Sequence, residues 1–346
     1  MIDCENSNLA FVISLESSLL TINNRRAIVF PQTINQRHWT LTLIGLIFPV
    51  HFGKIGMSLT IRPIEQADAE ACGNIGYQAH EVISSAHGYP SEQPSIEFAV
   101  GMIKTLLVNP TSWGALAERN GRILGSIFLH VFPPSPVAAI GPLTVDPSAE
   151  GGVGRALMDT VLGEARKRQY DRVRLIQSPS HVRSFVLYTK CGFTLREPLL
   201  LMQGNPIRNS SFSRYTHDIR AASVDDIPAC NQLCMSVHGF SRELELRQGI
   251  DQGVASLTID KQGNITGYAA GIGFFSHAVA KTNEDLIALV SSAPAIIGHG
   301  LFVPARNADL VRWLLEAGFR IGWPANLMTV GQYNEPRGTY FPSIAF

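Results

Sequence analysis

Residues 140–158 read Ile140-Gly-Pro-Leu-Thr-Val-Asp-Pro-Ser-Ala-Glu-Gly-Gly-Val-Gly-Arg-Ala-Leu-Met158. This pattern predicts a strand, a tight glycine turn, and a helix that begins at the turn. Gly151, Gly152 and Gly154 let the backbone bend and approach a ligand closely. The first N–H groups of such a helix have no partner within it and carry a partial positive charge. The stretch therefore predicts an anion site of the kind that usually binds phosphate, to which Arg155 could add a cation.

Three phosphate-binding patterns compete for this stretch. A P-loop ends in Gly-Lys-Ser/Thr, whereas this chain has Gly154-Arg-Ala156. A dinucleotide-binding turn needs a third glycine, and Leu157 occupies that position. Such a fold also places an acidic residue at the end of the next strand, but Asp171 precedes the strand predicted over Arg172–Gln177. A third pattern fits better.

Val145-Asp-Pro147 followed by Gly152-Val-Gly-Arg-Ala-Leu-Met158 resembles the acyl-CoA pyrophosphate loop of the GNAT N-acetyltransferases. A second segment, Ser184-Phe-Val-Leu-Tyr-Thr-Lys-Cys-Gly-Phe193, resembles the helix of that family that ends in Leu-Tyr-x-Lys-x-Gly-Phe. Two such elements in the family's order are far more specific than a glycine turn alone.

The composition limits the other classes of protein. The chain has 346 residues, of which 45% are apolar and 16% charged, with 28 basic and 28 acidic side chains. The length predicts two domains, and the zero net charge argues against general nucleic-acid binding. Five cysteines without metal-ligand spacing predict reduced thiols, a cytoplasmic protein and no metal site. The apolar run Trp39–Val50 is too short to span a membrane. We expect no membrane partner, and a monomer or homodimer.

Domain boundaries follow from changes in pattern. Residues 1–56 show no sustained hydrophobic period, and our hypothesis is that they are an N-terminal extension that is not part of the native protein. Strands and helices alternate from Met57, including a hairpin around Asn120-Gly121 and a helix that the carboxylate of Asp68 is expected to cap. This pattern predicts an α/β fold with a mixed sheet. We assign 57–204 to a catalytic domain, 205–216 to a linker and 217–346 to a second domain.

The second domain repeats features of the first. Ile61-Arg62, Asp68 and Ala71-Cys72 are matched at identical spacing by Ile219-Arg220, Asp226 and Ala229-Cys230. Residues 121–125 match 263–267, and residues 181–193 match 307–319, each in the same order. These echoes predict a tandem duplication, hence two tandem GNAT-like acyl-CoA N-acyltransferase domains. The second copy has no glycine turn in 280–286, and Leu314 replaces its tyrosine, so we expect it to be degenerate.

The resemblance implies a specific cofactor site. In the family, the strand before the loop diverges from its neighbour and the pantetheine arm bonds to its backbone, here through Leu143 and Val145. The unpairable Pro142 is consistent with this divergence. The pyrophosphate would be surrounded by residues of the turn and the first helical turn, namely Gly152, Val153, Gly154, Arg155 and Ala156. Ala149 departs from the family's usual Gln or Arg, which removes one polar contact.

The same resemblance implies roles on the second helix. Tyr188 would be the general acid that protonates the leaving thiolate, although a tyrosine on an amphipathic helix is often simply a core residue. Ser184 would contact the cofactor, because His181 stands where the family often has asparagine.

No general base is evident from the sequence. Glu118 and His130 are candidates by position only. The loop 86–94, with His87 and Tyr89, could line an acceptor pocket.

Together these features predict an N-acetyltransferase that passes an acetyl group from acetyl-CoA to an amine by direct attack. The acceptor could be a small molecule or a peptide amine, which includes a protein-modifying acetyltransferase. A non-catalytic acyl-CoA-binding sensor or scaffold is the alternative.

Overall fold

The computed structural model describes residues 58–149, 151–207 and 218–345, together with the backbone of three short strands nearer the N-terminus. The chain divides into two compact units, Met1–Gly56 and Met57–Phe346. In the first unit, β1 (Phe11–Val12), β2 (Leu19–Ile22) and β3 (Arg26–Val29) form an antiparallel sheet. The rest of the predicted extension, and most of the predicted linker, lie outside the described residues.

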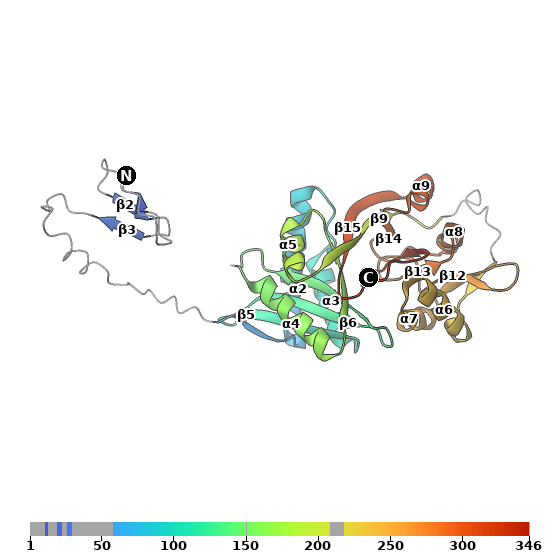
Figure 1. The fold of residues 1–346 in the computed structure, drawn as a ribbon, viewed down its shortest axis with the longest axis horizontal. Coiled ribbons are helices and arrows are strands. Elements are labelled where there is room, and N and C mark those ends of the chain that lie inside the picture. Colours follow the sequence, from blue (N-terminus) through green and yellow to red (C-terminus); the bar gives the residue numbers. More distant parts are fainter. Residues whose placement is uncertain are drawn as a thin grey trace, which may run out of the picture. The chain divides into compact units, whose positions relative to one another are not determined.

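The second unit contains two series of elements in the same order (Figure 1). The first series is β4 (Thr60–Pro63), η2 (Gln66–Asp68), α2 (Ala69–His87), α3 (Ile96–Val108), β5 (Ser112–Arg119), β6 (Arg122–Val131), β7 (Val137–Val145), α4 (Val153–Lys167), β8 (Arg172–Gln177), α5 (Val182–Lys190) and β9 (Thr194–Gln203). The second series is β10 (Asp218–Ala221), η4 (Val224–Asp226), α6 (Ile227–His238), α7 (Glu243–Asp251), β11 (Ser256–Ile259), β12 (Ile265–Ala269), β13 (Ala278–Ala280), α8 (Asn283–Ser292), β14 (Leu301–Pro304), α9 (Ala308–Glu316), β15 (Arg320–Val330) and β16 (Thr339–Phe341). The prediction of a mixed α/β fold is confirmed.

The two series exchange one strand. The larger sheet has the order β14-β9-β15-β8-β7-β6-β5-β4, so β9 lies between β14 and β15, and β15 lies between β8 and β9. Figure 1 shows β9 and β15 side by side between the two halves. Both strands follow a Gly-Phe pair at the end of a helix, Gly192-Phe193 and Gly318-Phe319, which marks them as equivalent strands of the repeat. Each half thus completes the sheet of the other.

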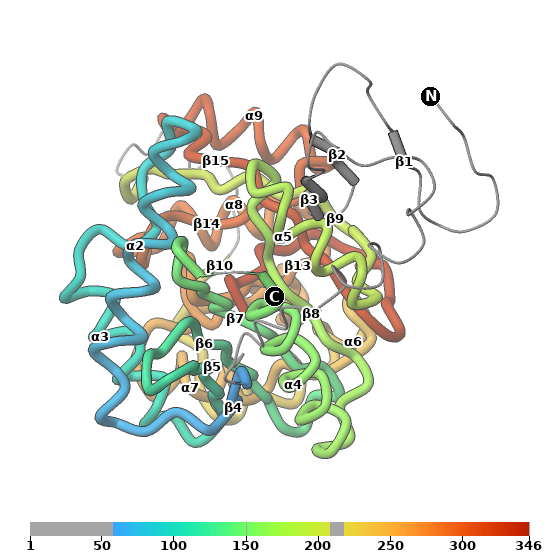
Figure 2. The backbone as a smooth tube through the Cα atoms, turned by 90° about the vertical axis from the view of Figure 1, so that its left-hand side faces the viewer, coloured from blue at the N-terminus to red at the C-terminus, as the bar shows by residue number. Residues whose placement is uncertain are grey.

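The remaining strands of the second half form a separate sheet with the order β10-β11-β12-β13-β16. The last strand, β16, pairs antiparallel with β13, and Figure 2 shows the C-terminal end of the chain close to β13. In this half β16 therefore occupies the edge of β13 that faces β14.

Helix α4 covers one face of the larger sheet. Its stripe of Val153, Leu157, Val161 and Ala165 is fully buried, as the i, i+4 spacing predicts. Helices α2 and α3 pack on the other face through a separate cluster around Phe128. Residues of β6 therefore alternate between the cluster under α4 and the cluster under α2 and α3.

The repeated Arg–Asp motif has a structural explanation. The Arg62 guanidinium donates to both carboxylate oxygens of Asp68 at 2.7 and 2.8 Å, and Arg220 binds Asp226 in the same way. The prediction that the Asp68 carboxylate caps α2 is wrong, because that carboxylate is occupied by Arg62 and by the N–H of Glu65. The pair lowers the pKa of Asp68, chiefly through the hydrogen bond from Arg62.

Within the described residues, no helix has the length and apolar character needed to cross a bilayer.

Candidate functional site

The glycine turn has the geometry of an open helix N-terminus. Gly152 precedes α4 with φ of 99°, in the left-handed region that favours glycine. A side chain at Gly151 or Gly152 would meet no atom within 4 Å, so these positions face open space. The first turn of α4, which is described throughout, carries no acidic side chain. Free N–H groups, a positive dipole end and open space together can hold an anion.

Gly154 has a different role. A Cβ atom there would lie 3.2 Å from Cδ2 of Leu187 on α5 and 3.7 Å from Cγ2 of Val145 on β7. The missing side chain lets α4 approach both elements closely. The glycine turn, β7 and α5 therefore lie next to one another around Gly154.

Strands β7 and β8 diverge beside the turn. They pair in parallel only from Val137–Ala139 to Arg172–Arg174, although β7 continues to Val145 and β8 to Gln177. The Asp146 N–H donates to the Leu124 carbonyl on β6 at 2.9 Å. Since main-chain groups alternate in direction along a strand, those of Leu143 and Val145 point away from β6 and into the gap. The gap therefore offers a free strand edge to an extended ligand.

A bulge at Gly141 produces this divergence. The β6–β7 register shifts between Ile127 and Leu129, opposite Gly141-Pro142. The carbonyl of Gly141 accepts a hydrogen bond from Nε2 of His130, and Nδ1 of His130 accepts one from the Ser112 hydroxyl at 2.9 Å. Burial lowers the pKa of His130, so its imidazole is neutral. Both ring nitrogens are engaged in hydrogen bonds, so His130 stabilises the bulge by linking Ser112 to the carbonyl of Gly141.

Glu118, the other candidate base, accepts a hydrogen bond from Arg62 Nε at 3.0 Å. This contact makes it part of the Arg62–Asp68 cluster. Neither position named from the sequence is a free base among the described residues.

Arg155 begins the helix but binds protein groups in this structure. Its Nε donates to both oxygens of Asp159 at 2.9 Å, and Nη1 donates to the Lys190 carbonyl at 3.2 Å. A role in binding pyrophosphate requires the guanidinium to leave Asp159, and that role stays a prediction.

Tyr188 lies on α5 within the core that α4 covers. Its side chain is buried, and burial raises the pKa of its hydroxyl, which keeps the group protonated. Within the described part of the chain, the hydroxyl makes no hydrogen bond. Its ring lies 6.1 Å from the ring of Phe193, centre to centre. The phenol is therefore in the protonated form that a proton donor needs.

Ser184 is engaged at the start of the same helix. Its hydroxyl donates to the His181 carbonyl at 2.9 Å and accepts from Nε2 of Gln177 at 3.1 Å. Gln177 was not singled out from the sequence, nor was its partner Asn326 from the second half. Aligning the two copies residue by residue could have drawn attention to both.

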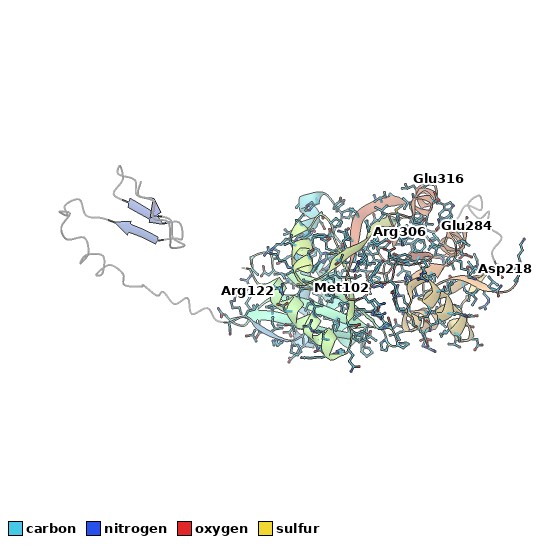
Figure 3. The ribbon with its side chains drawn as sticks, in the orientation of Figure 1. Met102, Arg122, Asp218, Glu284, Arg306 and Glu316 are labelled. Carbon is cyan, nitrogen blue, oxygen red and sulfur yellow. The ribbon has the colours of Figure 1, made fainter. Side chains whose placement is uncertain are left out.

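In the described residues of the second half, the start of α8, which corresponds to the start of α4, lacks the glycine turn. The Thr282 hydroxyl accepts the Asp285 N–H and so caps α8, and Glu284, labelled in Figure 3, and Asp285 make its first turn acidic. An anion would be repelled there. In addition, β16 occupies the edge of β13 that corresponds to the free edge of β7. The start of α8 thus differs from that of α4 in two independent features.

Other features of the described residues lie apart from the turn. A hollow of about 540 Å³ is lined by Gln203, Gly204, Asn205, Ile296, Gly298, His299, Gly300, Gly318 and Arg320. Its residue His299 packs edge-on against Phe98 of α3, which brings the second half next to this helix. The predicted pocket residues His87 and Tyr89 are exposed at the end of α2. No group of three metal-ligating side chains occurs in the described ranges.

Comparison with known proteins agrees with this geometry. Residues 77–193 match the family model described as the acetyltransferase (GNAT) family. No curated protein matches the chain. A solved structure of an acetyltransferase candidate from Pyrococcus horikoshii is 17% identical, covers 82% of this chain and 92% of its own, and has a TM-score of 0.58. That coverage spans both halves and shows a shared fold.

Two further solved structures are similar over different lengths. A tandem GNAT protein from the clavulanic acid biosynthesis pathway is 14% identical, with 79% of this chain and 98% of its own covered, at a TM-score of 0.47. The PaiA N-acetyltransferase from Thermoplasma acidophilum, in complex with coenzyme A, is 19% identical, with 41% and 92% covered, at a TM-score of 0.36.

Proposed function

Because residues 77–193 form a domain of the GNAT acetyltransferase family, we propose that this protein transfers an acetyl group from acetyl-CoA to an amine by direct attack. The observation that carries the proposal is the free edge of β7 directly beside the open glycine turn. The pantetheine arm would bond to the main chain of Leu143 and Val145 as an added strand, and the pyrophosphate would bind the N–H groups of Gly152–Ala156.

The reaction then depends mainly on placement. The amine nitrogen attacks the thioester carbonyl, the C–S bond breaks, and the thiolate takes a proton from the Tyr188 hydroxyl, which then regains a proton from water. Main-chain N–H groups in the gap would polarise the carbonyl. The amine must be neutral to attack, and its proton passes to water, since neither Glu118 nor His130 is free. The products are an N-acetyl compound and coenzyme A.

The two halves would have different tasks. Residues 57–204 would carry the chemistry, and residues 217–346 would complete the sheet and border the acceptor. The acceptor, a small-molecule or peptide amine, would enter from the face of α2 and α3, where Phe98 meets His299 of the second half. The four described cysteines are free thiols, which is consistent with a cytoplasmic enzyme.

Release of free thiol tests the proposal. The protein is incubated with acetyl-CoA and a panel of amines, amino acids and peptides with free N-termini, and thiol is measured with and without each acceptor. Acceptor-dependent release is expected. If coenzyme A binds but no acceptor across a broad panel increases release, the protein is a sensor or scaffold instead.

A further inference from the structure

We propose that Gln177 and Asn326 form a positioning pair that fixes the first turn of α5 for acyl-CoA, so that the second half supplies a residue to the cofactor site of the first. This inference rests on the proposed function only for the identity of the ligand. The placement of α5 by the pair can be measured without any ligand.

The pair connects the two halves at the end of β8. Asn326 on β15 lies opposite Gln177 on β8, and its Nδ2 donates to Oε1 of Gln177 at 2.9 Å. Gln177 is 2% exposed and Asn326 is 9% exposed. The strand exchange therefore brings a buried amide from the second half against a buried amide of the first.

Gln177, held by Asn326, in turn binds the residues at the start of α5. Its Nε2 donates to the carbonyl of Ser178, to the carbonyl of His181 at 3.2 Å and to the hydroxyl of Ser184 at 3.1 Å. His181, at the N-cap position, makes no side-chain cap bond of its own. With its oxygen held by Asn326, the amide of Gln177 must present its N–H groups to the turn. The beginning of α5 is thus organised from β8 and not by a capping residue.

The second copy provides an internal comparison. The position of Gln177 corresponds to Val303 on β14, and that of Asn326 corresponds to Leu200 on β9. These two residues also lie directly opposite each other in the sheet. At the equivalent position of the second copy, the two strands therefore pack through an apolar pair. The helix that follows, α9, is capped instead by Asn307, whose side chain accepts the N–H of Leu310.

The difference between the amide pair and the apolar pair indicates that the amides are not needed for strand packing. Strand pairing at this position does not require two amides, because Val303 and Leu200 support it without them. Burying two amides in place of apolar groups gives little net stability, since hydrogen bonds formed inside replace those to water. The amides occur in the copy that has the glycine turn, where α5 packs on α4 through Leu187 and Gly154. We assign their role to the orientation of α5 beside the cofactor.

The test transplants the apolar pair. The double variant Gln177→Val with Asn326→Leu gives the active copy the pair of the degenerate copy, in the full-length chain. The dissociation constant of coenzyme A should rise roughly tenfold, equivalent to one lost hydrogen bond, while the melting temperature stays close to that of the parent. Without ligand, hydrogen exchange at the amides of Val182–Phe185 should become faster.

Matched variants make the outcome decisive. Arg306→Gln removes another contact between the halves, its 2.7 Å bond to Glu197, and should lower stability without changing coenzyme A affinity. If the double variant does not fold, Gln177→Met keeps the volume but removes the amide and should show the same loss of affinity. Unchanged affinity together with unchanged exchange at α5 in a folded variant would overturn the inference. If the parent itself binds no coenzyme A, the proposed function fails, and exchange at α5 still tests the pair.

Discussion

Substitution of Gly152 by alanine separates backbone strain from ligand binding. Gly152 has φ of 99°, and a Cβ atom there would meet nothing within 4 Å. The change therefore introduces no clash, only a side chain in the left-handed region. Such a conformation costs an L-residue about 1–2 kcal/mol. We expect the free energy of unfolding to fall by that amount if the backbone keeps its conformation.

The effect on the ligand should be larger if the backbone relaxes. A change of φ at Gly152 turns the N–H groups at the start of α4 away from the anion. A hydrogen bond to a charged group contributes about 1.5–3 kcal/mol. Loss of one such bond would raise the dissociation constant of coenzyme A roughly 10- to 100-fold.

Gly163→Ala provides the control in the same helix. Gly163 lies within α4, where a Cβ atom would also meet nothing within 4 Å. Alanine in a helix interior is more stable than glycine by about 0.5–1 kcal/mol, so this variant should be slightly stabilised and bind normally. Titration calorimetry with coenzyme A and thermal unfolding give both quantities. A Gly152→Ala protein of unchanged stability has relaxed its backbone at the turn, and if it still binds coenzyme A within about twofold of the parent, the role of the turn is refuted.

Three further changes have defined outcomes. Tyr188→Phe should lower kcat roughly 100-fold with little change in KM for acetyl-CoA, because the ring contact with Phe193 is kept and only the proton donor is lost; an unchanged kcat would contradict this. Asp159→Asn should release Arg155 and tighten coenzyme A binding roughly two- to fivefold in calorimetry at low salt, and weaker binding would count against it. Burial, assisted by the charge of Arg242, lowers the pKa of His277 to about 4. The folded imidazole is neutral, so stability should fall as the pH drops from about 6.5 toward 4, and His277→Gln should flatten that fall in urea titrations.

Local elements of the fold were predictable because their signals are local. The hairpin turn at Asn120-Gly121 has positive φ at both residues, as the dipeptide predicts. Helix α4 begins after the glycine turn and buries the predicted stripe. The repeated Arg–Asp spacing identified the duplication, although its cause proved to be an ion pair and not helix capping.

Long-range pairing was not predictable in the same way. Nothing in the patterns of β9 or β15 distinguishes pairing within a copy from exchange between copies, since both strands carry apolar residues on both faces. The short strand Thr339–Phe341 follows Asn334-Glu-Pro-Arg-Gly338, whose proline and glycine predict a turn and not the approach of a strand. For the same reason the contact between Gln177 and Asn326, 149 positions apart, was invisible until the exchange was known.

Hydrogen exchange of the whole protein with and without coenzyme A tests the cofactor site most directly. The amides of Leu143 and Val145, and those of Val153–Ala156, should be protected when coenzyme A is added. The amides at the start of α8, where Glu284 and Asp285 stand, should not change. Absence of protection at the first set, or protection at α8 instead, would contradict the account.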